Sequence, residues 1–204
     1  TGALRDLAGK RIIYCSGMDC CTGKKTAAIL LAQALRERGV RAVWVPTGQT
    51  GIFIAGWGIV VDRVPGWLVT GAVERLILHT ARTADVILVE GQGSLFHPAY
   101  SGVTLALMHG TMAHAMTLSV PATPVDIQEE YGVDVPPLPK AIEAHERLMR
   151  PIRDCKVVGI AVNTCTVGED EGRAFCERCA AETGLPAADL MRFDGRALVD
   201  AVTA

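Results

Sequence analysis

Short apolar runs alternate with amphipathic segments along most of the chain. The runs RIIYCS (residues 11–16) and VILVE (residues 86–90) are short, mainly apolar and rich in β-branched residues, which is typical of buried strands. Residues 24–38 carry apolar side chains at helical spacing and stop at Gly39, which predicts a helix with a glycine at its C-terminal end. The same patterns predict strands at 42–45, 115–120 and 156–163, and helices at 71–83, 103–110, 140–149 and 169–183.

This alternation predicts an α/β fold with a mainly parallel sheet and helices on both faces. We expect one domain over residues 11–204, preceded by a lead-in or linker remnant at 1–10, and a proline-rich stretch at 121–139 that is mostly loop. Ligands of such sheets bind beyond the carboxyl ends of the strands. Three glycine-rich segments follow predicted strands at that edge, namely 17–23, 48–58 and 91–94.

Composition narrows the class of protein. The chain has 204 residues, half of them apolar, and a formal net charge of −2, which gives no electrostatic reason to expect nucleic acid or an anionic membrane as partner. No apolar run approaches the roughly 20 residues that span a bilayer, and no signal-peptide pattern is present. The seven cysteines are an odd number, with two of them adjacent, so reduced thiols and a cytoplasmic location are expected.

The segment SGMDCCTGKKT (residues 16–26) lies between a predicted buried strand and a predicted helix. Glycines, a helix N-terminus and a lysine are the elements that bind phosphate groups, so this segment predicts a phosphate-binding loop. Five residues separate Gly17 from Gly23, one more than in the standard Walker loop, and Lys25 stands where serine or threonine is usual. The residues expected to contact the phosphates are Gly17, Asp19, Cys20, Cys21, Thr22, Gly23, Lys24, Lys25 and Thr26.

Glu90 ends the VILVE strand beside this loop, the usual position of a magnesium ligand or of a residue that holds its water. If a magnesium ion binds, we expect Glu90, Asp19 and Thr26 to place it. Asp19 has an alternative role, which is to fix the turn of the loop. Cys20 and Cys21 lie near a helix N-terminus, where a thiolate is stabilised, although the sequence shows no base to activate a nucleophile.

Two further clusters carry candidate substrate contacts. His97 follows the VEGQGS segment in a loop and suits general acid or base chemistry, with Tyr100 and Ser101 orienting a polar substrate. The alternative is that these side chains only order the loop. The hydroxyl and amide side chains of Thr47, Gln49 and Thr50, after the second predicted strand, suit recognition of a carboxylate or a ribose; the alternative is an ordinary glycine turn. Gln92, in the VEGQGS segment, is a further candidate substrate contact.

The loop GMDCCTGKKT together with VEGQGS resembles dethiobiotin synthetase and related P-loop enzymes. A closer resemblance covers almost the whole chain. TGQTGIFIAGWG (47–58), VEGQGSLFHPAYSGVTLALMHG (89–110) and VVGIAVNT (157–164) are similar to the C-terminal P-loop domain of a formerly uncharacterised family. Some members of that family are labelled D-glutamate N-acetyltransferase, and members usually carry a second, N-terminal domain. The sequence departs from the family pattern at Pro65-Gly66-Trp67 and at Pro121-Ala122-Thr123-Pro124.

The resemblance implies an N-acetyltransferase that uses acetyl-CoA and acts on a small amino acid or carboxylate, in which His97 takes the amine proton. The candidate catalytic residues are His97, Lys24 and Glu90. An ATP- and Mg²⁺-dependent ligase or kinase is the alternative, in which Lys24 stabilises the γ-phosphate and Glu90 helps to place the metal. The third hypothesis is a nucleotide-binding subunit that needs a partner chain. We expect a small-molecule substrate, a homo-oligomer, and neither nucleic acid nor membrane as partner.

Overall fold

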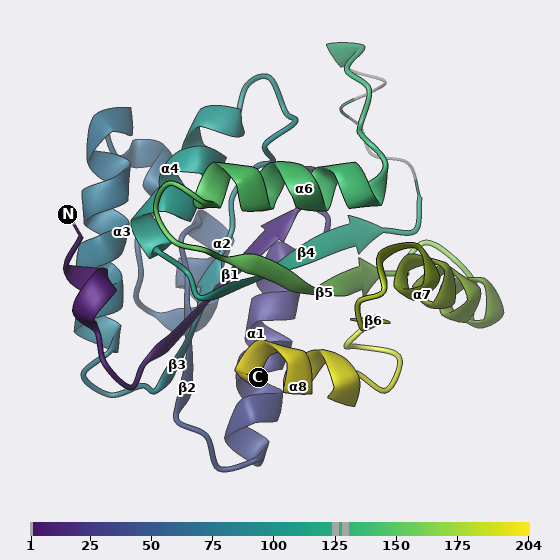
Figure 1. The fold of residues 1–204 in the computed structure, drawn as a ribbon, viewed down its shortest axis with the longest axis horizontal. Coiled ribbons are helices and arrows are strands. Elements are labelled where there is room, and N and C mark those ends of the chain that lie inside the picture. The colour runs from purple at the N-terminus through teal and green to yellow at the C-terminus, as the bar shows by residue number, and fades with distance from the viewer. Residues whose placement is uncertain (1, 124–126, 128–130) are drawn as a thin grey trace.

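The computed structural model describes residues 2–123, 127 and 131–204. Its centre is a parallel sheet of six strands in the order β2-β3-β1-β4-β5-β6 (Figure 1). This confirms the predicted α/β fold, a mainly parallel sheet of the P-loop nucleoside triphosphatase type with helices on both faces. The strands are β1 (Arg11–Gly17), β2 (Ala42–Val45), β3 (Val86–Glu90), β4 (Ala115–Pro121), β5 (Lys156–Asn163) and β6 (Ala187–Ala188).

Alternate strand residues point to opposite faces, and each face has its own apolar layer. In β1, for example, Ile12 and Tyr14 join one layer, whereas Ile13 and Cys15 join the other. Helices α1 (Lys24–Glu37) and α8 (Arg196–Thr203) pack on the second face. The first face is covered by α3 (Gly66–Thr80), α4 (Ser101–Thr111), α6 (Leu138–Met149) and α7 (Glu169–Thr183) (Figure 1).

The order of the strands places the ligand-binding edge. From β1 the sheet extends through β3 to β2 on one side, and through β4 and β5 to β6 on the other. Because the strand order reverses at β1, a crevice is expected outside its carboxyl end. Cys15 pairs in register with Glu90 of β3, so the segments after β1 and β3 lie side by side at that crevice.

Several elements were not predicted from the sequence. The segment 48–58 contains a short helix, α2 (Gln49–Ala55), where we expected a glycine-rich loop, and α3 begins at Gly66 rather than at residue 71. Strand β6 and helix α8 were also missed. All are short or contain glycine, so their local pattern is weak, and tertiary packing decides them.

The described part of the predicted lead-in, residues 2–10, packs against the domain. It includes a 3-10 turn (Ala3–Asp6) whose Leu4 is fully buried, and the amide of Ala3 donates to Glu74 of α3 (2.7 Å). A second 3-10 turn, Val61–Arg63, precedes α3.

Part of the predicted loop at 121–139 lies outside the described residues, and its last two residues already belong to α6. All seven cysteines are within the described residues and have free thiols, as expected. None of the described helices is long and apolar enough to cross a membrane.

Candidate functional site

The loop between β1 and α1 has the geometry of an anion site. Gly23 precedes α1 with a φ of 105°, in the left-handed region that favours glycine, and no side chain caps the helix. The first amides of α1 are therefore free to bind an anion at the positive end of the helix dipole. A hollow of about 420 Å³, here called the P-loop hollow, is lined by residues 20–26 and 90–93.

Lys24 is buried within this loop rather than exposed at the helix start. Its side chain is 7% exposed, and its Nζ donates a hydrogen bond to the backbone oxygen of Asp19. Burial lowers the pKa of Lys24, although nearby acidic groups act in the opposite direction. A phosphate would provide a second partner for a cation that is already held inside the loop.

Glu90 lines the P-loop hollow together with Lys25 and Thr26. Its side chain is 4% exposed, and its Oε2 accepts a hydrogen bond from the amide of Thr47 (3.1 Å). Burial raises the pKa of Glu90, while the Thr47 amide and the Lys25 charge lower it. Asp19 does not line this hollow, so the structure does not bring the three predicted magnesium ligands together around it.

Thr47 has a different role from the predicted substrate contact. It is fully buried, its hydroxyl donates to the backbone oxygen of Glu90 (2.7 Å), and the same hydroxyl accepts from Nε2 of Gln92 (3.1 Å). Thr47 therefore holds the end of β3, and its role as a substrate contact stays a prediction. Gln49 and Thr50 lie exposed at the start of α2, and their role as substrate contacts stays a prediction.

A second hollow, of about 360 Å³, adjoins the first. We call it the acidic hollow, because its described lining residues include two carboxylates and no lysine or arginine. The two hollows share Cys20, Cys21, Gln92 and Gly93. The other lining residues of the acidic hollow are Asp19, Asp62, His97, Tyr100, Val103 and Tyr131.

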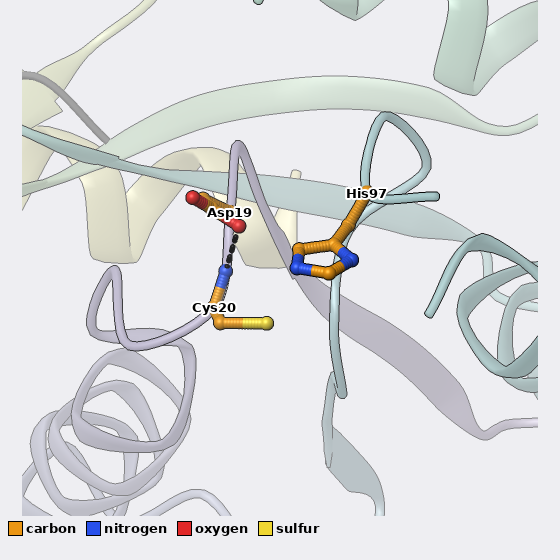
Figure 2. Close-up of side chains that lie close together, drawn as sticks. All are labelled: Asp19, Cys20 and His97. Carbon is orange, nitrogen blue, oxygen red and sulfur yellow. Dashed lines mark hydrogen bonds between the residues drawn. The ribbon is translucent and has the colours of Figure 1, made fainter. Parts of the chain in front are cut away.

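Asp19, Cys20 and His97 meet in the acidic hollow. One ligand atom from each lies within 4.8 Å of the other two, although His97 is 77 residues away from Cys20 in sequence (Figure 2). Asp19 is buried, and its two oxygens accept from the amides of Cys20 (2.6 Å) and Ile127 (3.1 Å). Asp19 therefore fixes the turn, one of the two roles considered for it, and it also faces the hollow.

His97 is buried and contacts Ala99, Tyr100 and Tyr131. It is 5% exposed, its Nδ1 accepts a hydrogen bond from the amide of Ala99 (3.1 Å), and its ring packs on Tyr100 and Tyr131 at centroid distances of 4.4 and 4.7 Å. The nitrogen that faces Asp19 and Cys20 is Nε2 (Figure 2). Ser101 is the first residue of α4, and its amide donates to the backbone oxygen of His97 (2.9 Å).

The structure changes the interpretation of the loop cysteines. Burial raises the pKa of Cys20, and Asp19 adds to this effect while Lys24 opposes it. The thiolate that its position near a helix N-terminus suggested is therefore disfavoured. His97, whose place beside Cys20 the sequence did not reveal, presents a nitrogen that already carries a proton when the ring is neutral.

A third hollow was missed entirely at the level of sequence. This apolar slot, of about 320 Å³, lies on the other side of the P-loop and shares Thr22, Gly23 and Thr26 with it. The exposed surface of its walls is mainly apolar, and its polar lining residues include Asn163 at the end of β5, Asp189 and Arg192. The wall at the end of β5 could have been suspected from the sequence, because that strand end lies at the same edge of the sheet as the P-loop. The opposite wall could not, because Leu190, Met191 and Arg192 come from the segment after α7.

Comparisons with known proteins agree with this arrangement. Residues 1–199 match the model of a family described as "Domain of unknown function (DUF1611_C) P-loop domain". The chain belongs to this family. A solved structure of a DUF1611 family protein from Anabaena variabilis is 33% identical, with a TM-score of 0.94 over all of this chain and 60% of that one.

A curated relative, the D-glutamate N-acetyltransferase of Tritonibacter scottomollicae, is 39% identical over 199 residues. The alignment covers 96% of this chain but only 59% of that protein, so the chain spans about three fifths of its relative's length. A cobyrinic acid a,c-diamide synthase from Mycobacterium smegmatis, solved with ADP and magnesium, is 14% identical with a TM-score of 0.59 over 95% of this chain and 91% of that one. That likeness shows the P-loop fold alone.

Proposed function

We propose that this domain binds acetyl-CoA and takes part in transferring its acetyl group to the amine of a small amino acid such as D-glutamate. The observation that carries the proposal is the order of three adjoining hollows along the carboxyl edge of the sheet. They are the apolar slot, the P-loop hollow and the acidic hollow. The name of the 39% identical relative supports the reaction class.

The first two hollows suit the nucleotide end of such a ligand. The apolar slot offers a narrow apolar space with the amide of Asn163 at its edge, which is suited to a planar base. The P-loop hollow offers the uncapped start of α1 and two lysines, Lys24 and Lys25, which are suited to a pyrophosphate. Coenzyme A and ATP share these two parts, so these hollows favour an adenine nucleotide without choosing between them.

The acidic hollow supports an amine as the acceptor. It follows directly after the phosphate site and contains Asp19, Asp62 and the buried His97. An amine bound there meets the acetyl group when the pantetheine arm, which begins at the pyrophosphate, folds into this hollow. Carboxylates and an imidazole line this hollow, and such groups can accept and donate protons in a bond-forming reaction.

The experiment is a set of calorimetric titrations with acetyl-CoA and with ATP, each with and without Mg²⁺, combined with an assay for acetylated D-glutamate. Magnesium-independent binding of acetyl-CoA and formation of N-acetylglutamate are the expected results. Binding of ATP only in the presence of Mg²⁺, with no acetylated product, would contradict the proposal.

One observation favours the ATP- and Mg²⁺-dependent ligase or kinase as a second candidate. Glu90 is a buried carboxylate whose hollow also holds Lys24, Lys25 and Thr26, which is a charge pattern suited to a metal-bound triphosphate. The titrations with Mg²⁺ distinguish this candidate from the first. Because the relatives are longer than this chain, a requirement for a partner chain, like homo-oligomerisation, stays a prediction.

A further inference from the structure

We infer that the acidic hollow is the binding site for the primary amine of the acceptor. In this inference Asp19 and Asp62 bind the ammonium group, and His97 acts as a neutral hydrogen-bond donor to the acyl oxygen. The inference rests on the proposed function, which it deepens by assigning the amine and its neighbours to named side chains.

The charges of the two adjoining hollows are opposite. Among the residues that the structure describes, the P-loop hollow is lined by Lys24, Lys25 and one carboxylate, whereas the acidic hollow is lined by two carboxylates and no lysine or arginine. Tyr100 and Tyr131, whose rings pack on His97, complete its aromatic side. An ammonium group therefore fits the acidic hollow, and an anion fits the P-loop hollow beside it.

His97 shows that the acidic hollow is built to meet a ligand. Its side chain is 95% buried, yet Nε2 faces Asp19 and Cys20 without a hydrogen-bond partner among the described residues (Figure 2). Its other nitrogen, Nδ1, accepts a hydrogen bond from Ala99, so in the neutral ring the proton resides on Nε2. Nε2–H can donate to an oxygen, and a neutral imidazole that polarises a carbonyl in this way is a known catalytic device.

The same hydrogen bond argues against two other roles for this cluster. A metal bound at Nε2 needs the lone pair there, and a metal-bound histidine donates its other N–H, whereas Nδ1 of His97 accepts. A general base at Nε2 also needs that lone pair. For this reason we assign proton uptake to Asp19 rather than to His97, the residue for which the sequence suggested it.

The ammonium of the acceptor gives one proton to Asp19, and the lone pair of the resulting amine forms a bond to the acyl carbon, whose oxygen is held by Nε2–H of His97. The carbon–sulfur bond of the acetyl donor then breaks and leaves its electron pair on sulfur. A second proton from nitrogen passes to that sulfur, which gives the amide and a free thiol.

Asp62 is the sharpest position for a test. Asp62 is an exposed residue of the turn Val61–Arg63, so Asp62→Asn should fold normally, whereas Asp19→Asn also disturbs a loop that Asp19 holds in place. With acetyl-CoA saturating, Asp62→Asn should raise the KM for D-glutamate roughly 10- to 100-fold, the size of a lost hydrogen bond to a charged group. Its KM for acetyl-CoA should stay within a few-fold. Asp170→Asn, on the exposed start of α7, is the matched control and should change neither value.

His97 is tested by two substitutions and one spectrum. His97→Ala should lower kcat by roughly 100- to 1,000-fold, as the loss of one carbonyl-polarising donor does. His97→Gln, whose amide can donate but cannot take a proton, should retain much more activity than His97→Ala. The ¹⁵N spectrum of the native protein should show Nδ1 of His97 unprotonated and Nε2 protonated.

The following outcomes distinguish failure of the amine site from failure of the proposed function. If D-glutamate is acetylated but both Asp62→Asn and Asp19→Asn leave its KM unchanged, the amine site is wrong and the function stands. If nothing is acetylated but D-glutamate binds wild type more tightly than Asp62→Asn, and glutarate, which lacks the amine, binds neither, the function is wrong and the amine site stands. Stoichiometric binding of Zn²⁺ that is lost in Cys20→Ser would make the cluster a metal site and overturn the inference.

Discussion

The P-loop hollow and the acidic hollow adjoin and share four residues, but they are encoded in different ways. The P-loop hollow comes mostly from one continuous segment, residues 20–26, with the end of β3 as its other wall. The acidic hollow draws on the P-loop, the turn that holds Asp62, the loop of His97, α4 and Tyr131. An anion site made from backbone amides is therefore local in sequence, whereas a site made from side chains of distant segments depends on the tertiary fold.

The charges follow the same division. Local backbone geometry makes the P-loop hollow positive, since an uncapped helix start and two consecutive lysines lie within one turn. The acidic hollow acquires its character only because the fold brings the carboxylates of Asp19 and Asp62 into one lining, whose described residues include no lysine or arginine. Four substitutions test this comparison, in decreasing order of expected effect.

Lys24→Ala should produce the largest effect and break the P-loop hollow. The Lys24 cation is held inside the loop, so its loss should weaken binding of the phosphate-containing ligand roughly 100-fold, the range for a hydrogen bond to a charged group. Calorimetric titration measures the affinity, and thermal unfolding verifies that the fold remains. The binding of D-glutamate alone should change far less, and an equal loss there would mean that the two hollows are one site.

The buried His145, which is hydrogen-bonded to Ser16 at the end of β1, should make the protein less stable in acid. Its Nε2 bonds Ser16 (2.8 Å), next to Gly17, and burial lowers its pKa to about 4. Between about pH 6.5 and pH 4, this histidine is protonated in the unfolded chain but not in the folded chain. The free energy of unfolding therefore falls as the pH drops through this range. The full loss is about 3 kcal/mol.

Denaturant unfolding between pH 7 and pH 4 checks this prediction. His145→Gln should flatten the acid limb of the stability curve, although His114, whose pKa is also lowered to about 4, leaves part of it. His79→Gln, at an exposed position of α3, should keep the limb of the native protein. An unchanged limb in His145→Gln would show that its protonation is not coupled to folding.

Gly51→Ala tests the wall between α2 and β3. A Cβ at this position would lie 2.5 Å from Oε2 of Glu90 and 2.9 Å from Cβ of Pro46. The crowding should cost about 1–3 kcal/mol of unfolding free energy, the usual range for an overpacked position. Gly102→Ala, also inside a helix but with open space around it, should be neutral or stabilising by up to about 1 kcal/mol. Equal stabilities of the two variants would mean that α2 moves freely away from Glu90.

Glu90→Gln should produce the smallest change in stability and the sharpest difference between ligands. Because burial raises the pKa of Glu90, its ionised form is disfavoured in the folded state, and stability falls as the pH rises from the ordinary carboxyl range to the folded pKa. The glutamine removes this penalty and keeps an acceptor for Thr47, so the variant should be slightly more stable at pH 7. Its affinity for acetyl-CoA should hardly move, whereas loss of Mg²⁺-dependent ATP binding would favour the second candidate function.

Much of the sheet could be predicted because buried strands carry a strong local signal. VILVE and KVVGIAVN were predicted with the observed bounds of β3 and β5, since fully buried parallel strands are continuous apolar runs. Helix α2 could not be predicted in the same way. Its seven residues include Gly51, a weak helix former, at a position where Glu90 and Pro46 leave no room for a side chain.

The sequence by itself determined the α/β class and the phosphate loop, because strand, glycines, lysines and helix are consecutive and act through the backbone. It also placed Glu90 and His97 at the correct edge of the sheet. Only the tertiary structure decided that Thr47 is buried against Glu90, that Lys24 lies inside the loop, and that His97 meets Asp19 and Cys20. The reason is physical: side chains from distant segments meet only when the strands pair in register, and no local pattern records that meeting.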